Sequence, residues 1–441
     1  MRSGGVLASP VLAAMSMVGV LALSACGATT TDDITVGPGK GWPAAYHDGR
    51  ASGTSPVVGS RKVTLNWARP LGGPIAQPVT IGPDGQMFVT TRTATCSIYS
   101  LQMATGRKRF CNPITPDSPM ASAVSAPTAV DGTTNVYVGD DGSMNSFNYL
   151  GQPRWRTPVA GVPIAAQFTA DGNLLSITQT GQVDVLNRQT GARVTPTLQL
   201  LGEPDPLAVP DLIRPASAQG MDDCRLGGPQ CPVATNAAVD PRSGRIYVTL
   251  WQPGHPAAAL VALRYHDGKV EREWFAEMLT RGASAGPTLS ADGRTVYVGD
   301  NSARLIAVDT ASGATRWVRQ LEFVARGGIS VAEDGRIIPA GDDGYLLALR
   351  DAGDRAENLW ERKDLALRGT PVQTAGNTGY TVAAIGDGLN LITFDTKSGA
   401  TVDSELLPDA LGSTTGPAIG PQGEVVVATR IGEVFVFKPN S

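Results

Sequence analysis

An internal repeat of about 40 to 49 residues runs through most of the chain and constrains its fold more than any other feature. In the clearest copy, a short strand after Gly286 leads through an Asp-Gly turn to the β-branched strand Val296–Val298. A second turn and the strand Leu305–Asp309 follow, and the copy ends in an outer strand that contains Arg316-Trp317. Each copy therefore predicts four antiparallel strands joined by tight turns.

The number of copies follows from the glycine expected at the first turn of each one. These eight glycines are Gly85, Gly132, Gly172, Gly244, Gly293, Gly335, Gly379 and Gly423. Repeats of this length with four strands each are typical of β-propellers. The 52 glycines and 32 prolines suit many short strands and turns. We therefore predict an all-β protein, an eight-bladed β-propeller of four-stranded antiparallel blades.

The two ends of the repeat array predict how the ring closes. The last copy stops after its third strand near Phe437, whereas Val63–Trp67 forms a strand that precedes any complete copy. Pairing this N-terminal strand with the last copy would supply the missing fourth strand and remove two exposed sheet edges. We expect the propeller to be closed in this way.

The outer strands carry a motif that resembles a known family. Residues 307–317, AVDTASGATRW, resemble the A-x-D-x-x-x-G-x-x-x-W repeat of the quinoprotein (PQQ) propellers. Weaker copies stand at Ser100–Phe110, Val185–Val194 and Thr393–Val402, and Trp42-Pro43 with Tyr46-His47-Asp48 resembles the opening segment of those proteins. The resemblance implies one PQQ-like propeller over residues 42–441. Its tryptophans are expected to pack between blades, and its turn glycines to adopt positive φ.

The N-terminus predicts export and a lipid anchor. Met1-Arg2 and the apolar run that follows are typical of a secretory signal over residues 1–25. Leu23-Ser24-Ala25-Cys26 resembles the lipobox of bacterial lipoproteins, which implies that Cys26 is lipidated. Residues 26–41 are polar and contain glycine, so we expect a flexible tether. An ordinary signal with a chance cysteine is the alternative.

Four further cysteines are expected to form two disulfides, because an exported protein folds in an oxidising compartment. Cys96 and Cys111 flank a predicted strand-turn-strand and are expected to face each other across a hairpin. Cys224 and Cys231 enclose a short loop that a disulfide would close. We predict the pairs Cys96–Cys111 and Cys224–Cys231 over the two other pairings.

The chemistry of known propeller enzymes is poorly supported by these residues. A PQQ-dependent dehydrogenase would need adjacent cysteines and a calcium set on long insertions, and no adjacent cysteines occur. The aspartates in Asp140-Asp141, Asp300-Asn301, Asp342-Asp343 and Asp387 are interpreted as hairpin turns rather than as calcium ligands. We therefore expect no cofactor, with PQQ and calcium both disfavoured. The net charge of −4 and the absence of a long basic run argue against nucleic-acid binding.

An interaction role remains. A lipobox followed by eight PQQ-like blades resembles the propeller component of the outer-membrane β-barrel assembly machinery, the BamB type, which is non-enzymatic. The resemblance implies a scaffold that binds cell-envelope proteins and is anchored by lipid to the outer side of the cell membrane or to another envelope membrane. The alternative is a PQQ- or small-ligand-binding propeller, either dehydrogenase-like or a sensor.

A candidate partner-binding region interrupts the regular repeat. The spacing widens to 72 residues between Gly172 and Gly244, which indicates an insertion at about residues 195–235. This insertion contains the predicted Cys224–Cys231 disulfide and Arg225, and the next hairpin carries Trp251 and His255. Long loops in compact domains are usually functional or disordered, and a disulfide-closed apolar loop favours the first. We therefore predict that Arg225, Trp251 and His255 contribute to a recognition surface. A decorative insertion packed on the propeller rim is the alternative.

Overall fold

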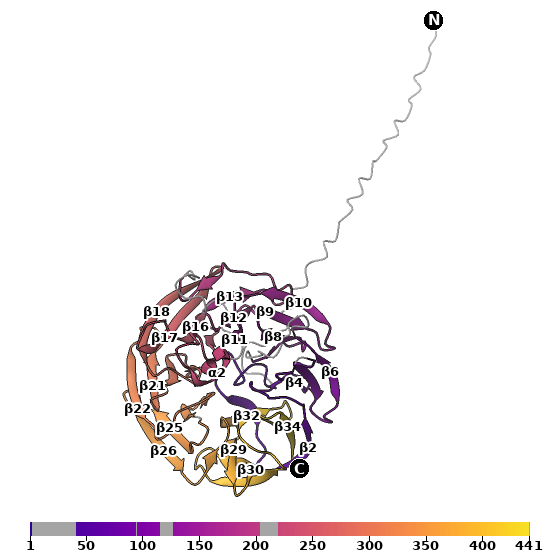
Figure 1. Cartoon of the computed structure of the whole chain (residues 1–441), viewed down its shortest axis with the longest axis vertical. Coiled ribbons are helices and arrows are strands. Elements are labelled where there is room, and N and C mark those ends of the chain that lie inside the picture. Colours follow the sequence, from indigo (N-terminus) through magenta and orange to yellow (C-terminus); the bar gives the residue numbers. More distant parts are fainter. Residues whose placement is uncertain (2–40, 94, 115–126, 203–218, 340, 441) are drawn as a thin grey trace. The chain divides into compact units, whose positions relative to one another are not determined.

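A computed structural model describes Met1 and residues 41–93, 95–114, 127–202, 219–339 and 341–440. Apart from Met1, the described residues belong to one compact unit. Its strands form eight sheets around a central axis, and seven of these sheets contain four strands each (Figure 1). The eighth has a four-stranded antiparallel blade with two added strands. The predicted all-β, eight-bladed propeller is confirmed.

The first four blades follow one another in chain order, each running from an inner to an outer strand (Figure 1). Blade A comprises β3 (Thr80–Ile81), β4 (Gln86–Thr90), β5 (Ile98–Gln102) and β6 (Lys108–Asn112). Blade B comprises β7 (Ala129–Val130), β8 (Val136–Asp140), β9 (Ser143–Phe147) and β10 (Pro153–Pro158). Blade C comprises β11 (Pro163–Phe168), β12 (Leu174–Thr178), β13 (Gln182–Leu186) and β14 (Leu198–Gln199). Blade D comprises β15 (Ala238–Asp240), β16 (Arg245–Leu250), β17 (Ala257–His266) and β18 (Lys269–Thr280).

The remaining blades complete the ring. Blade E comprises β19 (Thr288–Leu289), β20 (Thr295–Gly299), β21 (Arg304–Asp309) and β22 (Thr315–Gln320). Blade F comprises β23 (Ile329–Val331), β24 (Arg336–Pro339), β25 (Leu346–Asp351) and β26 (Ala356–Arg362). Blade G comprises β28 (Val372–Ala375), β29 (Thr378–Ile385), β30 (Gly388–Asp395) and β31 (Thr401–Leu407), with β1 (Thr54–Val58) and β27 (Ala366–Leu367) added. Blade H comprises β32 (Thr414–Ile419), β33 (Val425–Thr429), β34 (Glu433–Pro439) and β2 (Val63–Pro70).

The ring closes through the predicted N-terminal strand. Strand β2 pairs antiparallel with β34, and Leu65 stands opposite Phe437. The first and last parts of the propeller thus share one sheet. One turn glycine was predicted wrongly: the first turn of blade G lies at Gly376 and Asn377, whereas Gly379 is buried inside β29. Phe394 occupies the space that a side chain at Gly379 would need, since a Cβ there would lie 2.3 Å from its ring.

The segment before β2, residues 41–58, runs along the inner strands and contacts every blade from A to G in chain order. We call it the N-terminal segment. Its backbone carbonyls accept hydrogen bonds from the first strand of each blade except C, where the Gln167 side-chain amide donates to the Asp48 carbonyl at 3.0 Å. The backbone donors are Ile81 (A), Val130 (B), Val239 (D), Leu289 (E), Val331 (F) and Gln373 (G). The segment ends as β1, which pairs parallel with β28.

Tryptophans of the outer strands join neighbouring blades, as the resemblance implied. Each indole N–H donates across to the blade that follows in the ring, and the acceptors are the carbonyls of Met103 for Trp67, Arg188 for Trp155, Thr310 for Trp274 and Thr396 for Trp360. Trp317 instead donates to the Asp351 carboxylate at 2.8 Å. The motif residue therefore builds the blade interface, which explains its recurrence without any chemical function.

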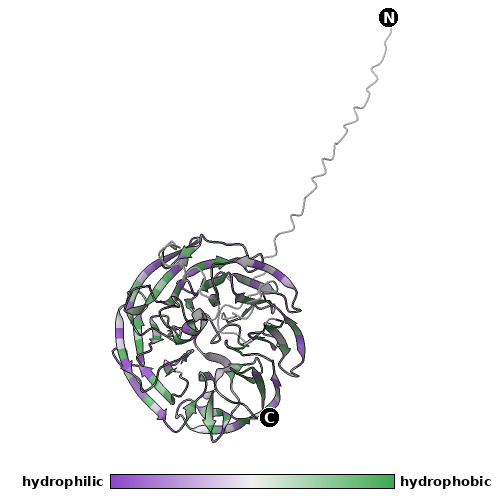
Figure 2. Ribbon diagram, viewed as in Figure 1, coloured by the Kyte–Doolittle hydropathy of each residue, from purple (hydrophilic) through white to green (hydrophobic). Residues whose placement is uncertain are grey.

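The core consists of the inner strands, several of which are buried along their whole length. Hydrophobic residues concentrate in these strands, while the outermost strands alternate in polarity because one face meets solvent (Figure 2). Within the described residues, no helix has both the length and the apolar character that a membrane span requires.

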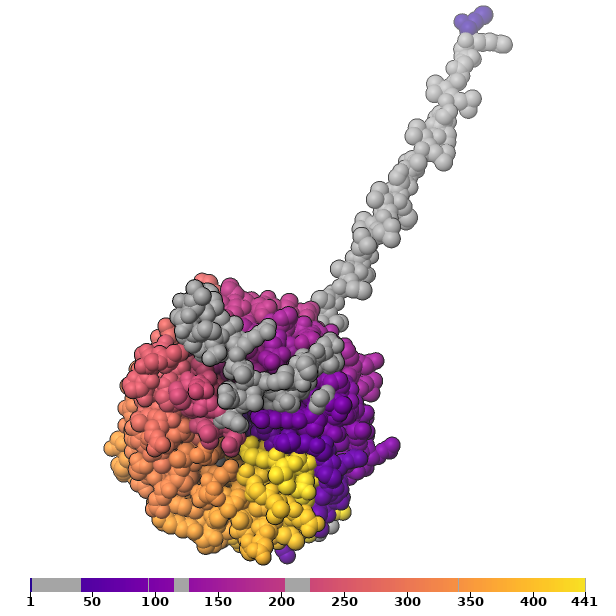
Figure 3. All heavy atoms as spheres, in the orientation of Figure 1, coloured from indigo at the N-terminus to yellow at the C-terminus, as the bar shows by residue number. Residues whose placement is uncertain are grey.

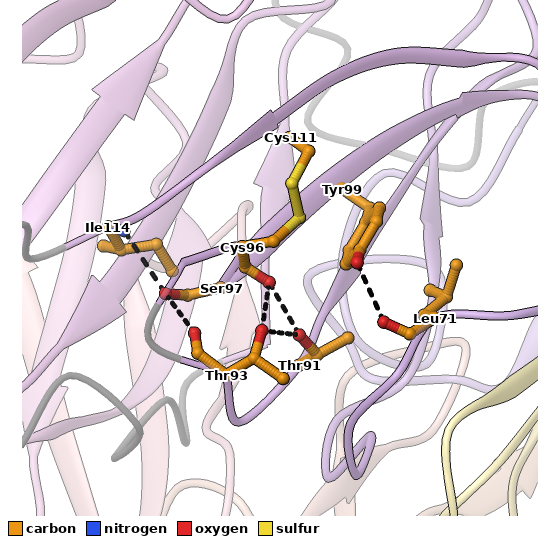
Figure 4. Close-up of a disulfide and its surroundings, with 8 residues drawn as sticks. All are labelled: Leu71, Thr91, Thr93, Cys96, Ser97, Tyr99, Cys111 and Ile114. Carbon is orange, nitrogen blue, oxygen red and sulfur yellow. Dashed lines mark hydrogen bonds between the residues drawn. A yellow bond between two sulfur atoms is a disulfide. The ribbon is translucent and has the colours of Figure 1, made fainter.

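The predicted Cys96–Cys111 disulfide is present in blade A. Cys111 lies on β6 opposite Tyr99, and its Cα is 5.3 Å from that of Cys96 (Figure 4). The Cys96 carbonyl accepts hydrogen bonds from the hydroxyls of Thr91 and Thr93 at 2.7 and 2.8 Å. The loop before β5 is therefore fixed both by the disulfide to β6 and by these two hydrogen bonds.

The predicted aspartate turns lie between the second and third strands of blades B, E, F and G. In blade E, the Asp300 carboxylate accepts the backbone N–H groups of Ser302 and Arg304, each at 3.0 Å, which closes the turn locally. Because strands alternate in direction, these turns lie on the same side of the ring as the connections between blades. We call this side the connection face.

Candidate functional site

A cavity of about 140 Å³ lies where the connection face meets the central axis. Its lining comes from the N-terminal segment, from the connections before blades A, B, D, E and F, and from turns of blades A, F and H. A wider space of about 590 Å³ adjoins it and shares Arg225, Arg326 and Asp342 with it. Both spaces are formed by loops that a rigid ring positions, which is where binding residues commonly lie.

Four arginines line the central cavity: Arg92 and Arg430 from second turns, Arg326 from the connection before blade F, and Arg225 from the insertion. Arg430 donates to the Ala76 carbonyl at 3.1 Å. The side chains of Arg92, Arg225 and Arg326 have no hydrogen-bond acceptor or ion-pair partner among the described residues, and Arg92 Nε is also buried.

Neutral polar side chains also line the cavity, among them Asn236 and Tyr46. Asn236 is buried, and its Nδ2 has no hydrogen-bond partner in the described part of the chain. The Tyr46 ring lies against Gly328, where a Cβ would come within 2.5 Å of it. Burial raises the pKa of Tyr46 to about 12, an effect that nearby Arg430 opposes and Asp342 reinforces. Its hydroxyl therefore stays protonated at neutral pH.

Among the described residues that line the central cavity, Asp342 is the one carboxylate. Burial raises its pKa, and Asp343 adds to the effect, whereas Arg430, Arg326 and Arg368 oppose it. Two more carboxylates line the adjoining space but already have partners: Asp343 lies 2.5 Å from Arg368, and Glu322 lies 2.7 Å from Lys363. The cavity is thus rich in donors and carries an excess of positive charge.

The insertion contains a helix that the sequence did not predict. Helix α2 (Gln219–Leu226) lies near the ring axis (Figure 1) and includes Cys224 and Arg225. It ends at Gly227, whose φ is +68°, and the N–H groups of Gly227 and Gly228 donate back to the carbonyls of Cys224 and Asp223. This double hydrogen bond is a Schellman C-cap, which requires a glycine-compatible backbone at that point.

Three sets of contacts hold this helix end on the ring. The predicted Cys224–Cys231 disulfide is present, with a Cα–Cα distance of 4.9 Å, and packs against Val162 and Ile164 of blade C. Asn301 of blade E donates to the Leu226 carbonyl at 2.7 Å. The Pro232 carbonyl accepts the N–H of Trp251 at 2.7 Å. Arg225 is exposed at the end of this fixed helix.

The structure divides the predicted recognition residues into two groups. Arg225 lines the central cavity, but neither Trp251 nor His255 does. Trp251 is half-buried over Gly282, and its indole N–H donates to the His255 carbonyl at 3.0 Å. His255 is exposed, and its Nδ1 lies 2.8 Å from a Glu277 oxygen. Both residues belong to a blade D turn on the connection face. Part of the predicted insertion, residues 203–218, lies outside the described residues, and β14 supplies a blade strand from within the predicted range.

The other cavity arginines were missed by sequence reasoning, although the repeat contains a signal for two of them. In blade E, the strand residue Tyr297 stands opposite Ala307, which stands opposite Trp317. The residue four positions after Tyr297 is Asn301. This position lies in the turn between the second and third strands. In the other blades it is occupied by Arg92 (A), Asp141 (B), Trp251 (D), Asp342 (F) and Arg430 (H). Aligning the copies at this position would have singled out Arg92 and Arg430 as candidates for the axis. Arg326 lies in a connection between blades, where the repeat offers no equivalent position to compare.

The cavity does not fit a calcium-bound quinone. Calcium takes six to eight oxygen ligands, whereas the lining offers one carboxylate. Among the described residues, no group of three or more His, Cys, Asp or Glu side chains could hold a metal.

Comparison with known proteins places this chain among relatives of the same architecture. Protein Rv3035 of Mycobacterium tuberculosis is 35% identical over 414 residues, which cover 92% of this chain and 98% of that protein. Outer membrane protein assembly factor BamB of Yersinia pestis is 25% identical over 312 residues, covering 69% of each chain. A family model described as outer membrane protein assembly factor BamB matches residues 235–441.

Solved structures agree on the fold. BamB of Moraxella catarrhalis superposes with a TM-score of 0.56 at 17% identity, over 86% of this chain and 98% of that one. The quinohemoprotein alcohol dehydrogenase of Comamonas testosteroni gives a TM-score of 0.61 at 13% identity, over 91% of this chain and 81% of that one. At these identities the likeness concerns the fold alone. The chain therefore belongs to the same family as Protein Rv3035 of Mycobacterium tuberculosis, and its fold is a PQQ-like β-propeller.

Proposed function

We propose that this protein is a non-enzymatic scaffold of the cell envelope that binds partner proteins on its connection face. The observation that carries the proposal is the rigid presentation of the insertion. A disulfide, a capped helix and hydrogen bonds to blades D and E fix a segment that the repeat itself does not require. Fixing a surface loop before binding lowers the entropic cost of association.

The exposed residues of this region suit protein recognition. Leu226 is 44% exposed beside the charged Arg225, and Pro253 to Pro256 of the blade D turn are exposed on the same face. An apolar residue within a polar rim is typical of interface centres, where arginine is enriched. The matches to proteins named assembly factor BamB support the same class of function.

Two variants of the full chain test the scaffold. Arg225→Glu and Leu226→Asp should each lower the yield of partner crosslinked in the native envelope at least fivefold, while the melting temperature stays unchanged because both side chains are exposed. Val318→Asp, on the outer strand β22 and 50% exposed, is the matched control and should keep wild-type yield. Equal yields from all four proteins would place partner binding elsewhere.

We propose that the chain does not act as a quinoprotein dehydrogenase. The scarcity of calcium ligands among the described lining residues supports this. Mixing the protein with PQQ and calcium should give neither cofactor absorbance after gel filtration nor alcohol-dependent dye reduction. Retained cofactor with dye reduction would establish the dehydrogenase alternative.

We also propose that the chain is exported and anchored by lipid on Cys26, which lies outside the described residues. The lipobox-like Leu23–Cys26 supports this, and two acyl chains give stable membrane attachment where one is marginal. Cys26→Ser should move the protein from the membrane fraction to the soluble fraction or leave an unprocessed precursor. Unchanged fractionation and mass would contradict the anchor.

A further inference from the structure

Among the described residues, the lining of the central cavity carries more positive than negative charge. Four guanidinium groups face one carboxylate, and that carboxylate, Asp342, has a raised pKa because it is buried. Two carboxylates that line the adjoining space, Asp343 and Glu322, are already paired with Arg368 and Lys363. Positive charges held together in a concave site repel one another and attract an anion.

Several donors in this cavity lack acceptors. Arg92 Nε and Asn236 Nδ2 are buried without a hydrogen-bond partner among the described residues. The guanidinium groups of Arg225 and Arg326 have none either in that part of the chain. Buried N–H groups are nearly always satisfied in folded proteins. Arg92 Nε and Asn236 Nδ2 are therefore the buried donors that a bound acceptor would satisfy, and the more accessible guanidinium groups of Arg225 and Arg326 line the same cavity.

We propose that the central cavity binds a small oxyanion with two or more negative charges, a phosphate or a dicarboxylate, held by Arg92, Arg326, Arg430 and Asn236, with Arg225 at its edge. Guanidinium groups bind both kinds of anion through paired N–H···O contacts. The volume of about 140 Å³ admits a group of that size. This site goes beyond the proposed scaffold function. It shares Arg225 with the proposed partner surface, so Arg92 and Arg326, which belong to the cavity alone, are the residues that test it.

Isothermal titration of the full mature chain with inorganic phosphate and, separately, with succinate tests the proposal at low ionic strength. One anion should bind per protein, and it should raise the melting temperature, because a ligand that binds only the folded state stabilises it. Arg326→Gln and Arg92→Gln should each weaken binding at least tenfold. Neither side chain has a hydrogen-bond acceptor to lose in the described residues, so both variants should melt like the wild type without ligand.

Arg107→Gln is the matched control, since Arg107 is exposed on the β5–β6 turn of the opposite face and its loss changes the net charge equally. It should bind the anion with wild-type affinity. Binding of phosphate alone identifies a phosphate site, and binding of succinate alone identifies a carboxylate site. The proposal is overturned if the wild type binds neither anion, if Arg326→Gln binds as tightly as the wild type, or if Arg107→Gln weakens binding to the same extent.

Discussion

At the residue scale, each position of the repeated motif has a structural task. Trp274 of blade D lies against Gly313 of blade E, whose φ is +72°. A Cβ at Gly313 would lie 2.9 Å from the indole ring. Glycine is therefore required at this position for two reasons: the positive φ of the backbone and the close approach of the neighbouring blade.

Replacing this glycine tests the second requirement separately from the first. Gly313→Ala should lower the free energy of unfolding by roughly 2–4 kcal/mol, since the left-handed backbone and overpacking each cost about 1–2 kcal/mol. Gly268→Ala is the control, because its φ is +70° but nothing lies within 4 Å of the added Cβ. Urea unfolding should show the smaller loss for Gly268→Ala; equal losses would mean that the indole contact contributes nothing.

The motif aspartate predicts a dependence of stability on pH. Arg316 donates to the Asp309 carboxylate at 2.7 Å, and Ala311 and Ser312 donate their backbone N–H groups to it. The Arg316 hydrogen bond is the main reason that the pKa of Asp309 falls to about 2. A lowered pKa in the folded state gives stability that is complete above the unfolded value near 3.9 and is lost as the pH falls towards 2.

Asp309→Asn should accordingly cost about 1–2 kcal/mol at pH 6 and progressively less between pH 4 and pH 2. Urea unfolding of both proteins across this range measures the difference. Asp354→Asn removes an exposed turn carboxylate whose partner Arg355 is also exposed, so it should change stability by less than about 0.5 kcal/mol throughout. A loss for Asp309→Asn that stays constant with pH would refute the linkage.

At the element scale, the insertion shows how a disulfide fixes a short helix. Helix α2 has only eight residues, and isolated helices of that length are marginal in water. The Cys224–Cys231 disulfide and the Gly227 cap hold its C-terminal end, and Gly282 permits the close approach of the Gly227 carbonyl. Periodicity could not reveal this helix, because tertiary contacts stabilise it.

The double variant Cys224→Ser with Cys231→Ser should therefore loosen the helix without unfolding the ring. A disulfide across this loop contributes roughly 2–3 kcal/mol in the chain-entropy model. We expect hydrogen exchange of the Gly227 and Gly228 amides to quicken by tenfold or more, with the strands of blades C and D unaffected. The Cys96→Ser, Cys111→Ser pair is the control and should leave the α2 amides protected. Unchanged exchange in the first variant would show that the cap and packing suffice.

At the scale of the whole molecule, the ring is joined in two ways by its N-terminal part. Strand β2 completes blade H, and the N-terminal segment contacts the other seven blades from within. Neighbouring sectors around the ring follow the chain order (Figure 3). The N-terminal segment thus connects sectors that are far apart in sequence, and Trp42 is buried against blade A.

A chain that begins at residue 60 should keep the closed ring but lose these internal contacts. At about 1 kcal/mol per net hydrogen bond, the loss is on the order of 5 kcal/mol. Its melting temperature should fall clearly below that of a chain that begins at residue 41, while the far-ultraviolet circular dichroism keeps its β-sheet signature because β2 remains. Equal melting temperatures would show that the segment only fills the axis.

The architecture could be predicted from the amino-acid sequence: four strands per copy, eight copies, closure by Val63–Trp67 and both disulfide pairs. Strand periodicity, turn chemistry and cysteine spacing act within one blade, so they can be recognised in a short stretch of sequence. The closure could be predicted because the last copy lacks its fourth strand and the N-terminal part has one to spare. Only the tertiary structure decided which residues share the axis. Arg92, Arg326 and Arg430 are more than a hundred residues apart in sequence, and they meet because the closed ring brings second turns and connections of different blades to one face near the axis.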